Sequence, residues 1–244
     1  MNLEKAWKNF LEEILINGEM HVKDDGDVLL ESLINHCFID NALKQFGGQN
    51  ITTKMFLDMI KQGVFNVKGY PVKDVALYDY VTSLDNPEII ENMNLDGSAK
   101  FTYTYPNRIF RMGCDDAAAS VDQFELMIKR LCVREGYVGS NRAVANIYSA
   151  PKDYTMDDIP CLQILQATIR NDELILHCYF RSNDCYGAFV SNMLFLNYLG
   201  LKLVDRLRGD YPSLSFKGIS YTSSSLHIYQ GDFDAAKKVV GLGD

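Results

Sequence analysis

Two β-rich runs and one long apolar segment near the end of the chain most restrict what it can fold into. The runs at 161–170 and 173–181 are separated only by Asn171-Asp172, and a two-residue connection of this kind predicts an antiparallel hairpin. The segment 189–207 is mostly apolar, which predicts a helix buried on several sides. We therefore expect a sheet packed against a buried helix.

The remainder of the chain contains both helical and strand-like patterns. Leu3, Trp7 and Leu11 share one face of an amphipathic helix predicted over 3–16. Further helices are predicted at 53–62, 121–134 and 232–240, and one starting near Glu88. Strands are predicted at 28–39, 143–148, 214–221 and 226–229, and loops at 94–113 and 149–159. Without a repeat or a low-complexity linker, residues 1–244 are expected to form one α+β domain, with a mixed or antiparallel sheet layered with helices.

Charge and cysteine spacing exclude several classes of function. The formal net charge of -8 argues against general nucleic-acid binding, but a single phosphate needs only a few arginines. The cysteines show no C-x-x-C spacing, so neither a metal nor a disulfide framework is expected. The chain has no apolar run of membrane-spanning length and no signal-peptide pattern at its start, which predicts a cytoplasmic protein without membrane association.

Cysteine, arginine and serine residues around the predicted hairpin suggest covalent chemistry on a phosphorylated substrate. Cys161 opens the first strand, and the hairpin returns Arg181 to the same end of the sheet, where a cation favours a thiolate nucleophile. Arg181-Ser182 combines a guanidinium with a hydroxyl, a pair suited to a phosphate, and Arg142 offers a second arginine. The alternative is a packed thiol beside surface arginines.

Three further side chains suit recognition of a base and a sugar. Asn192 lies within the apolar segment, and its carboxamide matches a heterocycle that carries an acceptor beside a donor; the alternative is a core amide. His227 and Tyr229 alternate along a strand and therefore share one face, which suits a sugar hydroxyl or an ordinary half-exposed strand.

These positions together resemble the thymidylate synthase family, most closely its short archaeal form. The resemblance covers residues 101–244, whereas 1–100 are divergent. It rests on the following motifs: Tyr105-x-x-Arg108, Asp122-Gln123, Ser140-x-Arg142, Pro160-Cys161, Arg181-Ser182-x-Asp184, Asn192 and His227-x-Tyr229.

The resemblance implies a homodimeric transferase of nucleotide biosynthesis, a methyltransferase that converts dUMP to dTMP. Its cosubstrate would be a reduced pterin, 5,10-methylenetetrahydrofolate or methylene-tetrahydromethanopterin, and it would use no metal. Each matched position takes the role that the family pattern implies. Cys161 would attack C6 of the pyrimidine, and Tyr105 would assist removal of the C5 proton. The phosphate would be held by Arg181, Ser182 and, from across the dimer interface, Arg142. Asn192 would recognise the base, His227 and Tyr229 would bind the sugar, and Asp184 would contact both base and cosubstrate.

Departures from the family pattern leave alternatives open. Leu162 follows the cysteine, Asn141 replaces one of two paired arginines, and Trp7 is the only tryptophan. The acidic residue expected in the N-terminal part of the site corresponds to Asp79 by position, or to none, with Tyr78 in its place. A pyrimidine-nucleotide 5-hydroxymethylase or an inactive nucleotide-binding homologue is therefore also compatible with the sequence.

Overall fold

The computed structural model describes residues 1–44, 52–65, 67–72, 74–85, 103–112, 120–132, 139–156 and 159–243. The strands are β1 (Glu19–Val22), β2 (Val28–Asp40), β3 (Val144–Asn146), β4 (Leu162–Arg170), β5 (Glu173–Asp184) and β6 (Ser215–Tyr229). The helices are α1 (Leu3–Asn17), α2 (Thr53–Lys61), α3 (Asp74–Thr82), α5 (Tyr105–Phe110), α6 (Gln123–Leu131), α7 (Ala150–Asp153), α8 (Phe189–Leu207) and α9 (Phe233–Val240), with 3-10 turns at Ser83–Asp85 and Gln230–Asp232.

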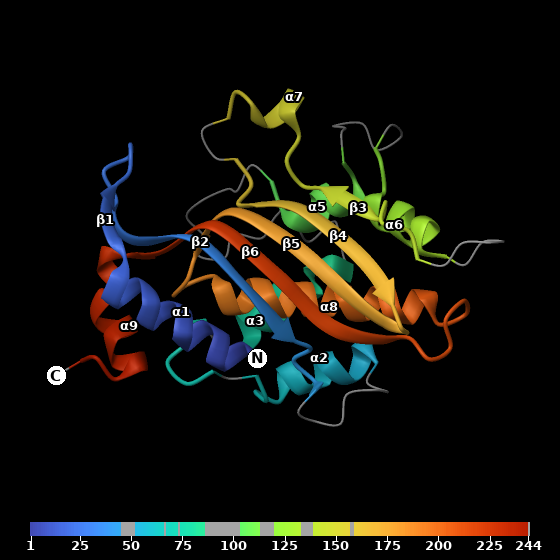
Figure 1. The fold of residues 1–244 in the computed structure, drawn as a ribbon, viewed down its shortest axis with the longest axis horizontal. Helices are drawn as coiled ribbons and strands as arrows, with labels where there is room; N and C mark the ends of the chain where they lie inside the picture. Colours follow the sequence, from blue (N-terminus) through green and yellow to red (C-terminus); the bar gives the residue numbers. More distant parts are fainter. Residues whose placement is uncertain are drawn as a thin grey trace.

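The strands form one mixed sheet in the order β1-β2-β6-β5-β4-β3. Neighbouring strands are antiparallel except β5 and β6, which run parallel. Helices pack on one side of this sheet, and the strands lie open to the viewer on the other in Figure 1. The predicted α+β class, with a mixed sheet layered with helices, is confirmed.

Helix α8 is the centre of the core. It spans the predicted segment and is buried along nearly its whole length, against β5 and β6 on one side and α3 on another. Gly200 permits this close approach, because a Cβ at that position would lie 2.3 Å from the ring of Phe216 on β6. Such burial explains why the segment is apolar on every face rather than along one stripe.

The hairpin between β4 and β5 forms as predicted. Asn171 and Asp172 have φ values of 52° and 56°, so both adopt the left-handed conformation that a two-residue type I′ connection requires. Asparagine and aspartate tolerate this conformation better than other residues with side chains. The hairpin brings Arg181 back to Cys161, and the Arg181 amide donates to the Cys161 carbonyl at 2.8 Å.

Three predictions of local structure were wrong. The two strands predicted at 214–221 and 226–229 are one continuous strand, β6, because pairing with β2 and β5 on both sides carries the chain through its serine-rich middle. Helix α5 lies in the predicted loop 94–113: Thr104 caps it, and Pro106 occupies its first turn. Helix α7 likewise occupies part of the predicted loop 149–159. The helix start predicted near Glu88 falls outside the described residues.

A buried ion pair ties α5 to α7. The Arg108 guanidinium donates to Asp153 Oδ1, and the side chains are 7% and 0% exposed. Asp153 Oδ2 also accepts from the Ser149 amide at 2.7 Å. The pair thereby fixes the orientation of α5, the helix that begins with Tyr105.

Removing the carboxylate of this pair should be strongly destabilising. Asp153→Ala leaves Arg108 buried without its counter-charge, so we expect the free energy of unfolding in urea to fall by about 3–5 kcal/mol. Asp234→Ala is the matched control: its ion pair with Lys237 is exposed at 3.9 Å, and its loss should change stability by less than about 0.5 kcal/mol. Equal losses in the two variants would contradict the structural role of the buried pair.

Candidate active site

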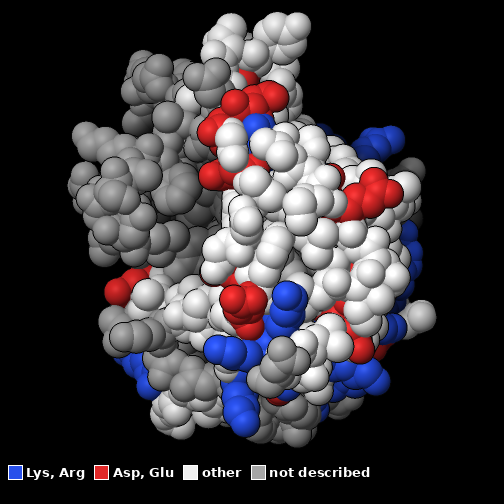
Figure 2. Space-filling model, turned by 90° about the vertical axis from the view of Figure 1, so that its left-hand side faces the viewer, with Lys and Arg blue, Asp and Glu red and all other residues white. Residues whose placement is uncertain are grey.

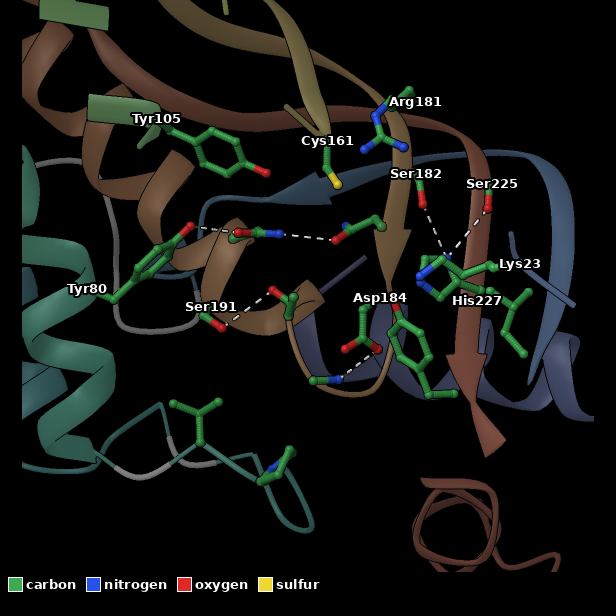
Figure 3. A pocket seen from close by; sticks show the side chains of 18 of the residues that line it. Lys23, Tyr80, Tyr105, Cys161, Arg181, Ser182, Asp184, Ser191, Ser225 and His227 are labelled. Atoms are coloured by element: carbon green, nitrogen blue, oxygen red, sulfur yellow. Dashed lines mark hydrogen bonds between the residues drawn. The ribbon is translucent and has the colours of Figure 1, made fainter. Parts of the chain in front are cut away.

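One large cavity gathers the side chains singled out in the sequence. Its volume is about 1630 Å³, and its walls come from β2, α3, the start of α5, the ends of β5 and β6, and the start of α8. Of the predicted site residues, these line it: Tyr105, Cys161, Arg181, Ser182, Asp184, Asn192, His227 and Tyr229. Segments far apart in the chain therefore meet at one place (Figure 3).

Cys161 and Arg181 lie next to each other at the edge of the cavity. The sulfur points into the hollow and the guanidinium lies beside it (Figure 3). Arg181 Nε donates to the Pro160 carbonyl at 3.2 Å and Nη2 donates to the Ile159 carbonyl at 2.7 Å. These bonds use only part of the five N–H donors of a guanidinium, so the others remain available to an anion. A thiol beside a fixed cation is the environment that favours a nucleophilic thiolate.

Tyr105 forms an aromatic wall near the sulfur. Its ring packs against Phe180 and Phe195, and its hydroxyl accepts from the Leu162 amide at 3.3 Å. Burial raises the pKa of Tyr105 well above its ordinary value, and the charge of Cys161 raises it further. The hydroxyl therefore stays protonated and takes part in chemistry as a hydrogen-bonding group rather than as a phenolate.

Asp184 is a carboxylate held in a turn. Its Oδ1 accepts from the amides of Tyr186 and Gly187, both at 3.0 Å. Glycine at position 187 leaves room for the carboxylate, because a Cβ there would lie 2.4 Å from Asp184 Oδ2 and displace it. Burial raises the pKa of Asp184 to about 6, although the two amide donors oppose the shift. A carboxyl group that titrates near neutrality is suited to proton transfer.

This pKa predicts a pH-dependent effect of Asp184→Asn on stability. Since the folded-state pKa lies above the usual 3.8, the ionised carboxylate destabilises the folded protein at high pH, and this penalty disappears as the pH falls below 3.8. The amide keeps an oxygen for the two backbone donors. We expect the variant to gain about 1–3 kcal/mol relative to the wild type between about pH 4 and pH 7 in urea unfolding. A stability difference that does not vary with pH would contradict this assignment.

Asn192 is a buried residue on α8 whose side-chain oxygen and nitrogen both form hydrogen bonds. It is 7% exposed; its Oδ1 accepts from the Tyr80 hydroxyl at 2.7 Å and its Nδ2 donates to Asn183 Oδ1 at 3.0 Å. Each of these atoms can form one further hydrogen bond, because Oδ1 keeps a free lone pair and Nδ2 keeps a free hydrogen. The side chain can therefore offer a donor beside an acceptor to a ligand in the cavity.

His227 and Tyr229 point to the same side of β6, as the alternation predicts. Their ring centroids are 5.0 Å apart, and His227 Nδ1 lies 3.3 Å from the Ser182 hydroxyl. Burial lowers the pKa of His227 to about 4, so the ring is neutral at pH 7. Its buried Nε2 has no hydrogen-bond partner among the described residues. An unpaired buried nitrogen at a cavity wall is suited to a ligand hydroxyl.

The turn between β1 and β2 lines part of the cavity with Lys23, Asp24 and Asp25. Lys23 pairs with Asp25 at 2.7 Å and Asp27 at 3.4 Å and lies 5.4 Å from the centre of the Tyr229 ring. In Figure 2, which faces the end of the molecule with β1, α1 and α9, acidic side chains gather at the top around a basic one. Carboxylates here repel the repeated phosphates of a nucleic acid.

Other residues discussed in the sequence lie away from the cavity. Arg142 is exposed and does not line it. Neither Asp79 nor Tyr78 lines it; α3 contributes Ala76 and Tyr80 instead, and the sequence analysis missed Tyr80. The missed signal is the helical spacing of Ala76 and Tyr80, which continues to Ser83 in the 3-10 turn after α3; all three residues line the cavity.

The described residues include neither a candidate metal cluster nor a candidate membrane-spanning helix. Within the described ranges, no group of three or more His, Cys, Asp or Glu side chains is arranged to hold a metal ion. No helix in the part of the chain that the structure describes is long and apolar enough to cross a membrane.

Curated proteins of methanogens are similar to this chain. A Methanocaldococcus jannaschii protein is 32% identical over 176 residues, which cover 69% of this chain and 70% of that protein. A Methanothermobacter thermautotrophicus protein is 27% identical over 236 residues, 96% of this chain and 94% of its own length. Both carry the name "Putative thymidylate synthase". No family model matches the chain. The extent of the first match, together with the cavity that the motifs form, shows that the chain belongs to the thymidylate synthase family.

Proposed function

We propose that this protein transfers a one-carbon unit to C5 of a uridine monophosphate, converting dUMP to dTMP through a covalent adduct at Cys161. The observation that carries the proposal is that three groups line one cavity: the Cys161 thiol, the Arg181 guanidinium with unused N–H donors, and the Asn192 carboxamide, which can pair with a base. The similarity to proteins named as thymidylate synthases supports the same reaction class.

The thiol chemistry follows from the electrophilic C6 of the pyrimidine. The Cys161 thiolate adds to C6, and the electron pair of the C5–C6 double bond moves to O4 as an enolate, which makes C5 a nucleophile. Asn192 Nδ2 donates to O4 as its charge develops, and fixed donors of this kind stabilise a transition state. After C5 has bonded to the methylene carbon, C5 loses its proton and the bond from that carbon to its carrier breaks. A hydride from the reduced carrier would then complete the methyl group as the thiolate leaves C6 and the C5–C6 double bond is restored. Tyr105 assists the proton loss through its protonated hydroxyl.

Each part of the nucleotide is matched to the cavity side chains that can form hydrogen bonds with it. The remaining N–H groups of Arg181, with the Ser182 hydroxyl, hold the 5′-phosphate. His227 Nε2 and the Tyr229 hydroxyl bind the sugar hydroxyl. Asp184, with its pKa near 6, lies between base and cosubstrate and exchanges protons with them.

The cosubstrate in this proposal is a reduced pterin, either 5,10-methylenetetrahydrofolate or methylene-tetrahydromethanopterin, which supplies the methylene group and the reducing hydride. The cavity is large enough for a second ring system, and Val72, Ala76, Tyr80 and Tyr103 give it an apolar and aromatic side. Flat heterocycles stack on such surfaces. No metal enters the proposal.

A hydroxymethylase is the second candidate, and the position of Trp7 favours it. Trp7 is fully buried in the core and donates to the Cys185 carbonyl at 2.7 Å, so this tryptophan does not shield the reacting carbon from water. Tyr80 and Tyr105 line the cavity near Cys161; burial raises the pKa of both hydroxyls, and the charge of Cys161 raises it further. How completely they exclude water decides between a methyl and a hydroxymethyl product.

Mass identification of the product tests these candidates. The protein is incubated with dUMP and each methylene-carrying pterin in turn, and UMP replaces dUMP in a parallel series. Formation of dTMP supports the proposal, and a 5-hydroxymethyl nucleotide supports the second candidate. If neither product forms with either carrier, the proposal fails; binding of dUMP by such a protein would identify it as an inactive nucleotide-binding homologue.

We further propose a homodimer in which Arg142 reaches the phosphate site of the other subunit. Arg142 is exposed and outside the cavity of its own chain, and the helix-free face of the sheet exposes Ile164 and Tyr179. A second copy on this face would bury both side chains.

Mixed dimers test the shared site. Arg142→Ala and Cys161→Ser chains are each expected to be almost inactive alone. After unfolding and refolding as an equal mixture they should recover about a quarter of the wild-type activity, because each mixed dimer contains one site with both native residues. Recovery would be absent if Arg142 acted within its own subunit.

A further inference from the structure

We propose that Tyr80, Asn183 and Tyr221 form a hydrogen-bonded relay that locks the Asn192 carboxamide in one orientation, so that the cavity reads uracil and rejects cytosine. The inference rests on the proposed function only in taking a pyrimidine nucleotide as the ligand. It assigns a specificity-determining role to Tyr80 and to two residues that the sequence motifs do not include.

An asparagine alone does not distinguish the two bases. A half-turn of its carboxamide exchanges the oxygen and the nitrogen with almost no change in shape. Uracil presents the acceptor O4 beside the donor N3–H, whereas cytosine presents a donor amine beside the acceptor N3. A carboxamide that is free to turn therefore matches either base, and discrimination requires that the turn be blocked.

The relay crosses four elements of the fold. The Tyr80 hydroxyl on α3 donates to Asn192 Oδ1 on α8 at 2.7 Å, and Asn192 Nδ2 donates to Asn183 Oδ1 on β5 at 3.0 Å. Asn183 Nδ2 in turn donates to the Tyr221 hydroxyl on β6 at 3.1 Å. Figure 3 shows the bonds from Tyr80 to Asn192 and onward as dashed lines. Asn183 is 2% exposed and Tyr221 is fully buried, so water does not compete for these groups.

The far end of the relay holds Asn183 in place. Asn183 Nδ2 donates to the Tyr221 hydroxyl, so Asn183 Oδ1 faces Asn192. The Ser223 hydroxyl donates to the Ser225 carbonyl at 2.6 Å, and it also interacts with Tyr221 and lowers the pKa of that tyrosine. A turn of Asn192 therefore requires a matching turn of Asn183 and a reversal of the bond to Tyr221, all among buried side chains.

The hydrogen bonds of Asn183 oppose a turn of the Asn192 carboxamide. A turned Asn192 would set its Oδ1 against Asn183 Oδ1, two acceptors facing each other without a hydrogen, and an unsatisfied buried pair of this kind lowers a binding constant by about ten- to a hundredfold. Burial raises the pKa values of Tyr80 and Tyr221 far above their ordinary range, so both hydroxyls keep their hydrogens at physiological pH. The hydrogen left on Nδ2 and the lone pair left on Oδ1 match O4 and N3–H of uracil.

Two tyrosine variants test the relay. Tyr80→Phe removes the donor to Asn192 Oδ1, and Tyr221→Phe removes the anchor far from the ligand. In both, we expect the ratio of dissociation constants for dCMP and dUMP, measured by titration calorimetry, to fall by about tenfold, mainly because dCMP binds more tightly. The ratio of kcat/KM values should fall in parallel. Ser223→Ala removes the hydroxyl group that interacts with Tyr221; it replaces Tyr221→Phe if that variant fails to fold, with an expected fall of about threefold.

Tyr211→Phe is the matched control. It removes another buried tyrosine hydroxyl, which donates to the Leu131 carbonyl at 2.7 Å, in a region that does not line the cavity. Its nucleotide preference should equal that of the wild type. If the relay had a purely structural role, the variants would weaken the binding of both nucleotides equally and leave the ratio of dissociation constants unchanged.

The outcomes separate this inference from the proposed function. A wild-type ratio in the folded Tyr80→Phe variant and in the folded second variant overturns the relay, even if dUMP is converted to dTMP. A wild-type protein that binds both nucleotides equally also overturns it. Selective binding of dUMP without turnover, relaxed by the variants, supports the relay and overturns the proposed reaction. Binding of neither nucleotide overturns both.

Discussion

Cys161→Ser is expected to lower the rate of dTMP formation from dUMP by at least about 10³-fold without changing the fold. Serine has nearly the shape of cysteine, but its hydroxyl does not ionise beside Arg181 at neutral pH, so the nucleophile that attacks C6 is lost. Unfolding in urea should remain within about 1 kcal/mol of the wild type, since Cys161 is only half-buried. Cys132→Ser is the matched control, because Cys132 is also half-buried but does not line the cavity.

A trapped adduct provides a second readout for the same residue. With 5-fluoro-dUMP, C5 carries a fluorine that cannot leave as a proton, so the thioether to C6 should persist in the presence of the methylene carrier. The intact mass of the denatured wild-type protein should rise by the mass of the nucleotide and carrier, while that of Cys161→Ser should stay unchanged. Adduct formation in the serine variant, or activity within tenfold of the wild type, would contradict the role of Cys161.

The second large effect is expected from Asn192→Asp. A carboxylate offers two acceptors, so it faces O4 of uracil with like charge but accepts from the amine of cytosine. We expect the ratio of kcat/KM for dUMP to that for dCMP to fall by about 10²–10⁴-fold, since a buried unmatched polar pair discriminates strongly. Steady-state rates with both nucleotides measure the change.

The relay around Asn192 adds a structural cost to this substitution. The carboxylate oxygen that replaces Nδ2 would face Asn183 Oδ1, so Asn183 must turn and its bond to Tyr221 must reverse. We therefore expect a loss of about 1–3 kcal/mol in the free energy of unfolding. Asn35→Asp, at another buried amide on the sheet outside the cavity, controls for the cost of burying a carboxylate. An unchanged nucleotide preference in a folded Asn192→Asp protein would show that this residue does not read the base.

Local signals were sufficient for much of the fold. The Asn171-Asp172 connection predicts the hairpin because left-handed conformations are favoured at these residue types, and the length of the apolar segment 189–207 matches α8. The prediction of two separate strands was wrong because β6 is held by two neighbouring strands rather than by the propensities of its serines. The N-cap Thr104 and the first-turn Pro106 of α5 are both present in the sequence, within the predicted loop 94–113.

The sequence alone determined the chemical inventory of the site: a cysteine after a proline, an Arg-Ser-x-Asp, an asparagine in an apolar helix, and a histidine and tyrosine two residues apart. These motifs are readable because each lies within a few residues of chain. Only the tertiary structure decided that Tyr80 rather than Asp79 reaches the cavity, that Asp184 is desolvated enough to titrate near pH 6, and that Asn192 is held by Asn183 and Tyr221. Burial and hydrogen-bond partners depend on which distant segments pack together, and no local pattern in a sequence records that packing.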